Sequence, residues 1–208
     1  MKAKRRFNIW LWVLLCVPCL LASCDHDVHD GEDEGGLSVS LTWADEADQG
    51  TEVKDVKLWI FDADKGSLIE EKHYGSTEEV ASQRFELPEG TYRILTTTNL
   101  TEPFFISEQT RSLTNWNNIQ IGLTNPKDVR NNAYFGVTDV RIDNKEGNYV
   151  VQNPIKSVLA ELTIIIENIP KGTEMSGKAL DCAWCLFPTL KNSDGDYGLP
   201  SIEPTEVE

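Results

Sequence analysis

The chain has few cysteines for its 208 residues, and this scarcity excludes a fold that depends on many disulfide bonds. Of the five cysteines, Cys16, Cys19 and Cys24 lie in or directly after an apolar N-terminal stretch. Only Cys182 and Cys185 remain for the body of the protein, so its hydrophobic core must stabilise it. Their C-x-x-C spacing matches a thiol redox motif, but the surrounding sequence does not predict the strand and helix that make such thiols reactive.

Histidine is also rare, and the residues of common catalytic sites show no recognisable arrangement. His73 is the only histidine outside the acidic N-terminal segment, no serine lies in a nucleophile elbow, and no glycine-rich loop precedes a predicted helix. His26 and His29 lie among aspartates, and residues 192–196 resemble a calcium loop that lacks its bidentate glutamate. We therefore predict no catalytic residue, no metal site and no enzymatic activity.

Basic residues are outnumbered by acidic residues, 19 to 34, which gives a formal net charge of −15. Loss of residues 1–23 would remove four basic residues and no acidic ones, which changes this charge to −19. Such a polyanion repels the phosphates of nucleic acids and of anionic lipids, so we predict no nucleic-acid partner. After residue 24 no apolar run is long enough to cross a hydrocarbon core of about 30 Å.

The N-terminal stretch has the organisation of a bacterial export signal. Basic residues within positions 2–6 precede the apolar segment 9–21, which is too short to span a membrane. The four residues that end the stretch are Leu21, Ala22, Ser23 and Cys24. They resemble a lipobox, in which the cysteine thiol carries a thioether-linked diacylglycerol. Residues 1–23 are thus predicted to be a lipoprotein signal peptide with lipidation at Cys24. The alternative is an ordinary secretory signal followed by a chance cysteine.

Residues 24–36 form an acidic segment with a single valine, and we predict a disordered tether because it cannot bury apolar surface. Its acidic residues are Asp25, Asp27, Asp30, Glu32, Asp33 and Glu34. Acidic residues directly after a lipidated cysteine resemble the surface-export signals of some Gram-negative lipoproteins, although a solvated spacer gives the same pattern. We expect an outer-membrane protein that faces the cell exterior. The covalent lipid on Cys24 is the only expected cofactor, and its acyl chains are the expected contact with the membrane.

Residues 37–150 contain short strand-forming segments that are separated by turn sequences. In the strand expected at 53–61, Trp59 and Phe61 make the second face apolar too, which indicates a central strand. Residues 62–66 predict a hairpin turn. The other expected strands lie at 37–43, 67–74, 83–87, 91–99, 119–123, 134–142 and 149–151. Since no segment before Pro154 shows sustained helical periodicity, we predict an all-β domain with a β-sandwich fold.

Residues 151–208 predict the beginning of a second β-domain. The strongest apolar run of the body, 155–169, favours a long buried strand, and 179–187 is its expected neighbour. After Pro188 the chain becomes polar, so we expect no further strand and a polar tail. The second domain is therefore expected to be incomplete. An unpaired edge at 155–169 would invite strand addition from another chain.

The lipobox and tether are followed by three motifs in a characteristic order. They are the strand Val56–Asp62, the phrase Leu87-Pro88-Glu89-Gly90-Thr91-Tyr92-Arg93-Ile94, and an entry strand at 157–164. This order resembles the FimB-type fimbrial anchor and accessory lipoproteins over about residues 20–170. The resemblance implies two transthyretin-like β-sandwiches in tandem, and it implies fimbrial subunits as partners. In this reading Gly90 permits a turn with positive φ, and Tyr92 begins the next strand.

Three aromatic residues in or beside an expected loop are candidates for a binding surface: Phe104, Phe105 and Trp116. Loops gathered at one end of a sandwich often recognise ligands. The alternative is that these rings fill the core. The main functional hypothesis is a lipid-anchored fimbrial anchor or accessory subunit that acts through strand and loop contacts. The other hypothesis is a surface lipoprotein that captures glycan or host protein through these aromatic rings.

Overall fold

The computed structural model describes residues 35–107, 115–124, 131–159, 165–174, 183 and 185–201. The lipobox at 21–24 and the acidic residues of the tether lie outside these ranges, so lipidation and surface export stay predictions. Within the described ranges, no helix combines the length and the apolar character that a membrane crossing requires. The predicted all-β sandwich is confirmed, and its helical elements are short. They are η2 (Glu46–Asp48), α2 (Thr77–Ala81) and η3 (Trp116–Asn118).

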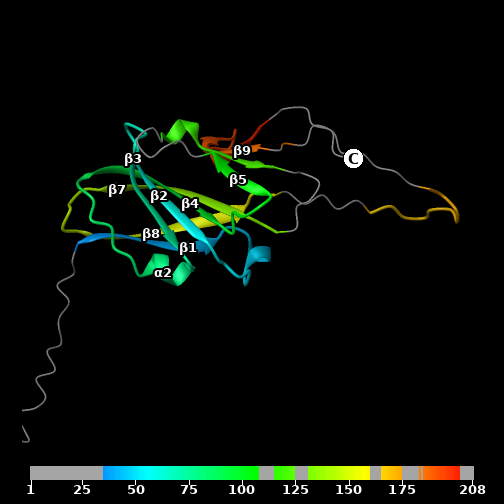
Figure 1. Ribbon diagram of the computed structural model, residues 1–208, viewed down its shortest axis with the longest axis horizontal. Coiled ribbons are helices and arrows are strands. Elements are labelled where there is room, and N and C mark those ends of the chain that lie inside the picture. The colour runs from blue at the N-terminus through cyan, green and yellow to red at the C-terminus, as the bar shows by residue number, and fades with distance from the viewer. Residues whose placement is uncertain are drawn as a thin grey trace, which may run out of the picture. The chain divides into compact units, whose positions relative to one another are not determined.

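The larger sheet has six strands in the order β1-β8-β7-β4-β2-β3 (Figure 1). In chain order they are β1 (Gly36–Trp43), β2 (Val56–Asp62), β3 (Leu68–Tyr74), β4 (Gly90–Thr98), β7 (Tyr134–Ile142) and β8 (Asn148–Ser157). The predicted central position of β2 is confirmed, because β2 pairs with β3 on one side and with β4 on the other. The expected strand at 83–87 is reduced to one isolated bridge, between Phe85 and Leu37 of β1.

Strand β2 buries side chains on both of its faces. Leu58 and Ile60 belong to a first hydrophobic cluster, which we call the curled-sheet core, whereas Trp59 and Phe61 belong to a second. The curled-sheet core also contains Leu37 of β1, although β1 is an edge strand and β2 lies near the opposite edge. Since both parts of the sheet contribute to one cluster, the sheet must curl around it.

The curl opens a gap between β7 and β8, whose residues pair at only two positions near one end. The side chain of Asn153 in β8 lies in this gap and is fully buried. Its Nδ2 donates to Thr96 Oγ1 of β4 at 3.0 Å, and its Oδ1 accepts from Thr138 Oγ1 of β7 at 3.0 Å. A buried amide must be hydrogen-bonded to be tolerated. Asn153 thus connects β8 to β4 and β7 at a place where no backbone pair joins β8 to β7.

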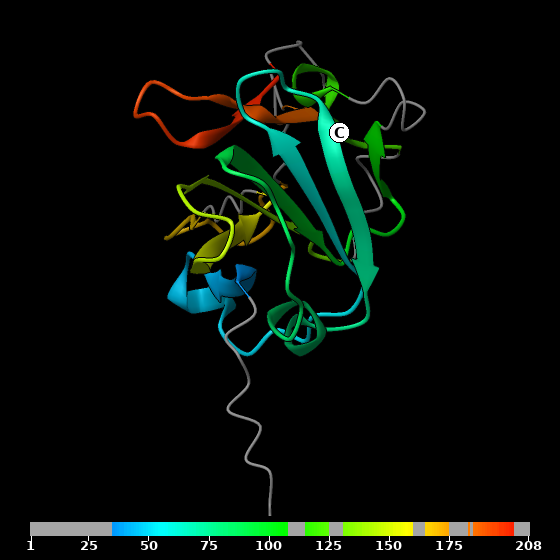
Figure 2. The same ribbon diagram turned by 90° about the vertical axis from the view of Figure 1, so that its left-hand side faces the viewer.

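The smaller sheet has four strands in the order β10-β9-β6-β5 and forms a separate layer against the larger one (Figure 2). Its strands are β5 (Phe104–Ser107), β6 (Gln120–Leu123), β9 (Cys185–Lys191) and β10 (Tyr197–Pro200). The second hydrophobic cluster, which we call the inter-sheet core, includes Trp59, Phe61 and Leu95 of the larger sheet together with Trp116 and Ile119. Ile106 of β5 and Tyr197 of β10 pack against it.

The structure corrects the expected division of the chain at residue 150. Strand β8 runs through this position, and it lies inside the larger sheet between β1 and β7. The long strand expected at 155–169 is wrong, because β8 ends at Ser157 and the described residues 165–169 form no strand. In place of a polar tail after Pro188, β9 continues to Lys191 and β10 follows. Both strands extend the sheet that β5 and β6 begin.

Two of these expectations failed because apolar character alone does not select a strand. Residues 155–169 are apolar enough for a buried strand, yet the side chains of Ile165 and Ile166 are exposed, at 79% and 54%. Strand β10 is four residues long and contains Gly198 and Pro200, two residues that weaken a strand prediction. Its place in the sheet depends on pairing with β9 and not on its own propensity.

Candidate functional site

The three predicted aromatic candidates lie in different environments. Phe104 begins β5 and is buried, and Trp116 begins η3 and is buried in the inter-sheet core. Phe105 is the exposed member, with 37% of its surface accessible. Its ring packs over Gly122 of β6, where a Cβ would lie 2.6 Å from the ring. The alternative that such rings fill the core therefore holds for Phe104 and Trp116, and Phe105 remains as a surface aromatic.

Trp116 is the centre of a cluster that joins the two sheets. Its ring meets Phe61 edge-on at 5.3 Å and Tyr197 edge-on at 5.8 Å between centroids. The guanidinium of Arg93 lies 4.8 Å from the same ring, and its Nε donates to Asp139 Oδ1 at 2.8 Å. Tyr197 donates its hydroxyl to Asp139 Oδ2 at 3.1 Å. We call these five residues the inter-sheet clamp.

The inter-sheet clamp has the character of a structural joint. Burial, followed by the charge of Asp139, raises the pKa of the Tyr197 hydroxyl, so the tyrosine stays protonated as a donor at neutral pH. Cation–π contacts of this kind contribute about 0.5–2 kcal/mol, depending on how far water is excluded. Trp116 was a candidate for ligand binding in the sequence, but its contacts within the sandwich occupy the ring.

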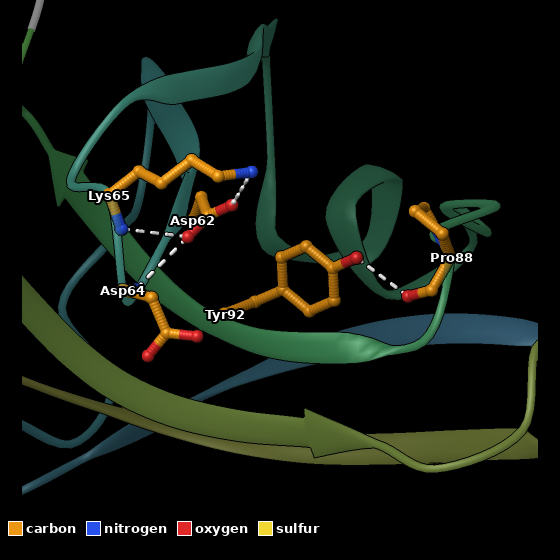
Figure 3. Close-up of polar contacts among 5 residues, drawn as sticks. All are labelled: Asp62, Asp64, Lys65, Pro88 and Tyr92. Carbon is orange, nitrogen blue, oxygen red and sulfur yellow. Dashed lines mark hydrogen bonds and ion pairs between the residues drawn. The ribbon is translucent and has the colours of Figure 1, made fainter.

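The Leu-Pro-x-Gly-x-Tyr phrase also proves to be structural. The hydroxyl of Tyr92 donates to the backbone carbonyl of Pro88 at 2.6 Å, which closes a tyrosine corner at the start of β4 (Figure 3). The expected positive φ at Gly90 is wrong, since Gly90 is not among the residues with positive φ. Gly90 is needed for a different reason: a Cβ there would lie 3.2 Å from the Tyr92 hydroxyl oxygen.

The turn between β2 and β3 is held by Asp62, as Figure 3 shows. Its Oδ1 accepts the backbone N–H groups of Lys65 at 2.9 Å and Asp64 at 3.0 Å, and its Oδ2 lies 3.2 Å from Lys65 Nζ. The pKa of the Asp62 carboxyl is lowered, first by the Lys65 backbone N–H and further by the Lys65 ammonium and the Asp64 N–H. The predicted hairpin turn is confirmed, and this carboxylate is its structural centre.

The remaining chemical candidates of the sequence have structural partners where they are described. His73 on β3 is exposed and contacts Asp55. Cys185 is buried in β9 and contacts Gln120, whereas Cys182 lies outside the described residues. Residues 192–196 form the β9–β10 turn, in which Asn192 Oδ1 accepts from the backbone of Asp194 and Asp196. Within the described ranges, no three metal-ligating side chains gather as a metal centre would require.

Two surface grooves lie beside the segment that connects β1 to β2. The first, of about 340 Å³, follows the end of β1 at Leu41–Trp43 and reaches Val53 and the start of α2. The second, of about 510 Å³, includes Asp55 and Asn99. Asn99 maintains the shape of this end: its Oδ1 accepts from the Lys54 backbone at 2.7 Å, and its Nδ2 donates to the Glu52 carbonyl at 3.0 Å.

Sequence reasoning did not identify either groove. The alternation at 37–43 predicts a strand, but it does not say which neighbours that strand has. Only the sheet order shows that β1 is an edge strand and that α2 packs beside it. The candidate functional surface is thus a strand edge with an adjacent groove, and no set of convergent catalytic groups accompanies it in the described part of the chain.

A curled, mixed sheet packed against a second, antiparallel sheet defines a β-sandwich. Residues 24–186 match the family of fimbrillin-A associated anchor proteins Mfa1 and Mfa2, and the chain belongs to this family. No curated protein sequence matches the chain.

Solved structures with a similar fold include the fimbrial anchor protein Mfa2 from Porphyromonas gingivalis, at 16% identity and a TM-score of 0.46. That match covers 59% of this chain and 50% of the Mfa2 chain. A fimbrial assembly protein from Parabacteroides distasonis is similar at 13% identity and a TM-score of 0.41, covering 82% of this chain and 75% of that one. The chain spans about half the length of most of the solved structures that it resembles.

Proposed function

We propose that this protein is a lipid-anchored surface subunit that attaches or assembles fimbriae. The observation that carries the proposal is the match of residues 24–186 to the family of fimbrial anchor proteins. The fold supports it, because a sandwich with open strand edges offers backbone groups to other β-proteins. The role is structural, and its partners are fimbrial subunit proteins.

Attachment to the membrane rests on Cys24 in this proposal. The matched region begins at this residue, which is the cysteine of the lipobox. Each buried methylene of an acyl chain contributes about 0.8 kcal/mol, so two or three chains give a long-lived anchor. The acidic residues at 25–34 then serve as a surface-export signal, and the protein faces the exterior of the outer membrane.

Replacement of the lipidated cysteine tests the anchor. We expect Cys24→Ala to move the protein from the detergent phase to the aqueous phase or to leave its signal uncleaved, because the thioether can no longer form. Cys16→Ala is the matched control, since it changes a cysteine of the signal that is not the acylated residue. Detergent partitioning and intact-mass measurement report the result. A Cys24→Ala protein that still carries acyl chains would contradict the lipobox assignment.

Purification of native surface complexes tests the fimbrial role. Cells are cross-linked, the protein is isolated from the outer membrane, and the proteins that accompany it are identified by mass spectrometry. Co-purification of fimbrial subunits supports the proposal, provided that it is lost in a strain that lacks the chain. Recovery of the chain without any accompanying fimbrial protein would contradict it.

Capture of glycans remains the second candidate function, and Phe105 is the observation that favours it. This exposed ring provides one stacking surface for a sugar, on the outer side of β5. The burial of Phe104 and Trp116 removes the other two rings from that role. Binding to a glycan array that is abolished by Phe105→Ala would select this function over the fimbrial one.

A further inference from the structure

The outward edge of β1 can be identified from its hydrogen bonds. The backbone N–H of Ala44, which follows β1, donates to Ile155 O at 2.9 Å, and Gly36 N–H donates to Gly147 O at 2.9 Å. Even-numbered residues of β1 therefore face β8. Leu37 instead exchanges backbone bonds with Phe85 at 3.0 and 2.9 Å on the opposite side. Since these directions alternate along a strand, the odd-numbered residues present their backbone groups away from β8.

Only the first part of this outward edge is covered. Phe85 pairs with Leu37, and α2 packs beside the strand. Within the described part of the chain, no hydrogen bond reaches the outward N–H and C=O groups of Leu41 and Trp43. Unpaired backbone groups on a strand edge are a template for another extended chain.

Two of the other sheet edges, those of β3 and β10, carry features that discourage pairing, and the remaining edge strand, β5, is only four residues long. Strand β3 presents the charged run Glu70, Glu71, Lys72 and His73, and β10 contains a register shift and Pro200. Charges, bulges and proline are the usual protection of exposed edges. The end of β1 is Leu41, Thr42 and Trp43, without charge or proline. Its edge is thus left open where those of β3 and β10 are protected.

A groove of about 340 Å³ lies directly beside this open edge. It is lined by Leu41–Trp43 of β1, by Ile155 of β8, by residues 51–53 and by Thr77 and Glu78 of α2. The ring of Trp43 is half-buried and packs edge-on against Tyr134, at 4.9 Å between centroids. Backbone groups on one side and a groove for side chains on the other are the two elements of strand addition.

The charge around the groove selects the occupant. Glu52 and Glu78 line it, and the acidic residues of η2 and its N-cap, Asp45, Glu46 and Asp48, follow β1 directly. Glu52 already pairs with Lys54 at 2.8 Å on the surface, whereas in the described part of the chain no basic side chain pairs with Glu78. The tether at 25–34 is a poor occupant because it has six acidic residues and no lysine or arginine. A second copy, itself strongly acidic, is disfavoured for the same reason.

We propose that the edge of β1 at Leu41–Trp43 binds an extended, lysine- or arginine-containing segment of a fimbrial subunit by β-strand addition. The segment pairs with the outward backbone groups of Leu41 and Trp43, and its basic side chains lie near Glu52 and Glu78. This assignment rests on the proposed fimbrial function for the identity of the partner. The acceptor edge itself rests on the hydrogen-bond directions and the groove.

The test uses the mature chain carrying Cys24→Ala and a terminally blocked peptide of alternating valine and lysine. We expect the peptide to slow hydrogen exchange at the amides of Leu41 and Trp43, as read by NMR, with no change at the outward amides of β3. A peptide that is N-methylated at every second residue cannot pair along one edge and should lose this protection. Protection that appears on β3, β5 or β10 instead, or at no strand edge, would overturn the assignment.

Charge variants separate edge pairing from general attraction to an acidic protein. Glu52→Lys combined with Glu78→Lys should weaken peptide binding by about tenfold, because both charges face the groove. Glu71→Lys combined with Glu89→Lys is the matched control, with the same change in net charge at exposed positions away from the groove. Equal weakening by both pairs would overturn the site. Unchanged melting temperatures show that both variants remain folded.

The same variants distinguish failure of the site from failure of the proposed function. If the groove variant loses the peptide and also loses co-purifying fimbrial subunits, the acceptor edge is supported. If it keeps the fimbrial subunits, the edge is not their attachment site, although the fimbrial role stands. If no fimbrial subunit co-purifies with the unmodified chain, the proposed function is contradicted. The peptide result alone then decides whether the edge accepts a strand.

Discussion

The two sheets of the sandwich differ in how they depend on the rest of the molecule. The larger sheet has extensive pairing between β4 and β7 and between β1 and β8, and it contributes to hydrophobic clusters on both faces. The smaller sheet joins two hairpins that are far apart in sequence, through the pairs Ile121–Leu186 and Gly122–Cys185. Its buried side contacts the inter-sheet core and the clamp around Trp116.

This difference indicates that the larger sheet is the stable foundation and that the smaller sheet depends on it. Burial of apolar area is the dominant favourable term in folding, and the larger sheet contributes to both clusters. The β9–β10 hairpin should therefore open locally at a lower free energy than the whole domain unfolds. Variants in the two sheets make this comparison measurable.

The largest effect is expected from Phe61→Ala in β2. The ring is fully buried and meets Trp116 at 5.3 Å, so its loss leaves a cavity that both sheets line. We expect the free energy of unfolding to fall by about 3–5 kcal/mol, measured by urea denaturation. Phe105→Ala is the matched control because it removes an exposed ring from the smaller sheet. A Phe61→Ala loss no greater than that of Phe105→Ala would contradict the proposed hierarchy.

A smaller and local effect is expected from Gly198→Ala in β10. Gly198 has φ of 104°, and a Cβ there would lie 2.5 Å from the Phe135 ring. Gly195→Ala is the control, since Gly195 also has positive φ but nothing within 4 Å of its Cβ position. We expect Gly198→Ala to destabilise by about 1–3 kcal/mol more than the control.

Hydrogen exchange shows where the Gly198→Ala effect lies. Faster exchange confined to β9 and β10 would confirm that this hairpin opens separately. Equal acceleration in β2 and β4 would mean that the two sheets unfold as one unit.

The polar part of the inter-sheet clamp, formed by Arg93 and Asp139, should contribute less, because it lies partly in solvent. Arg93 has 23% of its side-chain surface exposed, and its partner Asp139 has 41%. Arg93→Met keeps the aliphatic stem but removes the ion pair and the cation–π contact with Trp116, so we expect a loss of about 1–2 kcal/mol. Arg141→Met is the control, since Arg141 and Asp143 are both mostly exposed, and it should change stability by less than about 0.5 kcal/mol. Equal losses would exclude a role for Arg93 in joining the sheets.

The smallest effect concerns pH and the β2–β3 turn. Because the folded-state pKa of Asp62 lies below its ordinary value of 3.8, its stabilising contribution is complete above that value. It is lost as the pH falls through the lowered pKa. Asp62→Asn should therefore flatten the dependence of stability on pH in this acidic range, as followed by thermal melts. Asp64→Asn changes the same charge in the same turn and should leave the slope nearer to that of the parent.

The strands of the larger sheet were predictable wherever local pattern decides structure. Alternation at 37–43 and the doubly apolar segment Val56–Asp62 predicted β1 and the central strand β2. The turn at 62–66 was predictable because aspartate and glycine suit its geometry. The Leu-Pro-x-Gly-x-Tyr phrase marked the right place for a corner, although the reason for Gly90 is the close approach of the Tyr92 ring and not positive φ.

The smaller sheet was less predictable because its strands are short and their partners are distant in sequence. Phe104 and Trp116 were assigned to a loop region and became buried once β5, η3 and β10 came together. The run at 155–169 was misleading for the opposite reason. Its residues are apolar enough for a buried strand, but Ile165 and Ile166, which the structure describes there, are exposed. The candidate edge of β1 was not predictable from residues 37–43, which look the same in an edge strand and in an internal strand.

The sequence by itself determined the strand-forming segments of the larger sheet and the acidic charge, because each depends on neighbouring residues or on composition; the lipobox stays a prediction. Only the tertiary structure decided that β8 lies between β1 and β7, that β9 and β10 complete the sheet begun by β5 and β6, and that Leu41–Trp43 keep an open edge. Strand order and register are set by hydrogen bonds and packing between distant segments. Alternation within one segment can specify its faces, but it cannot specify its neighbours.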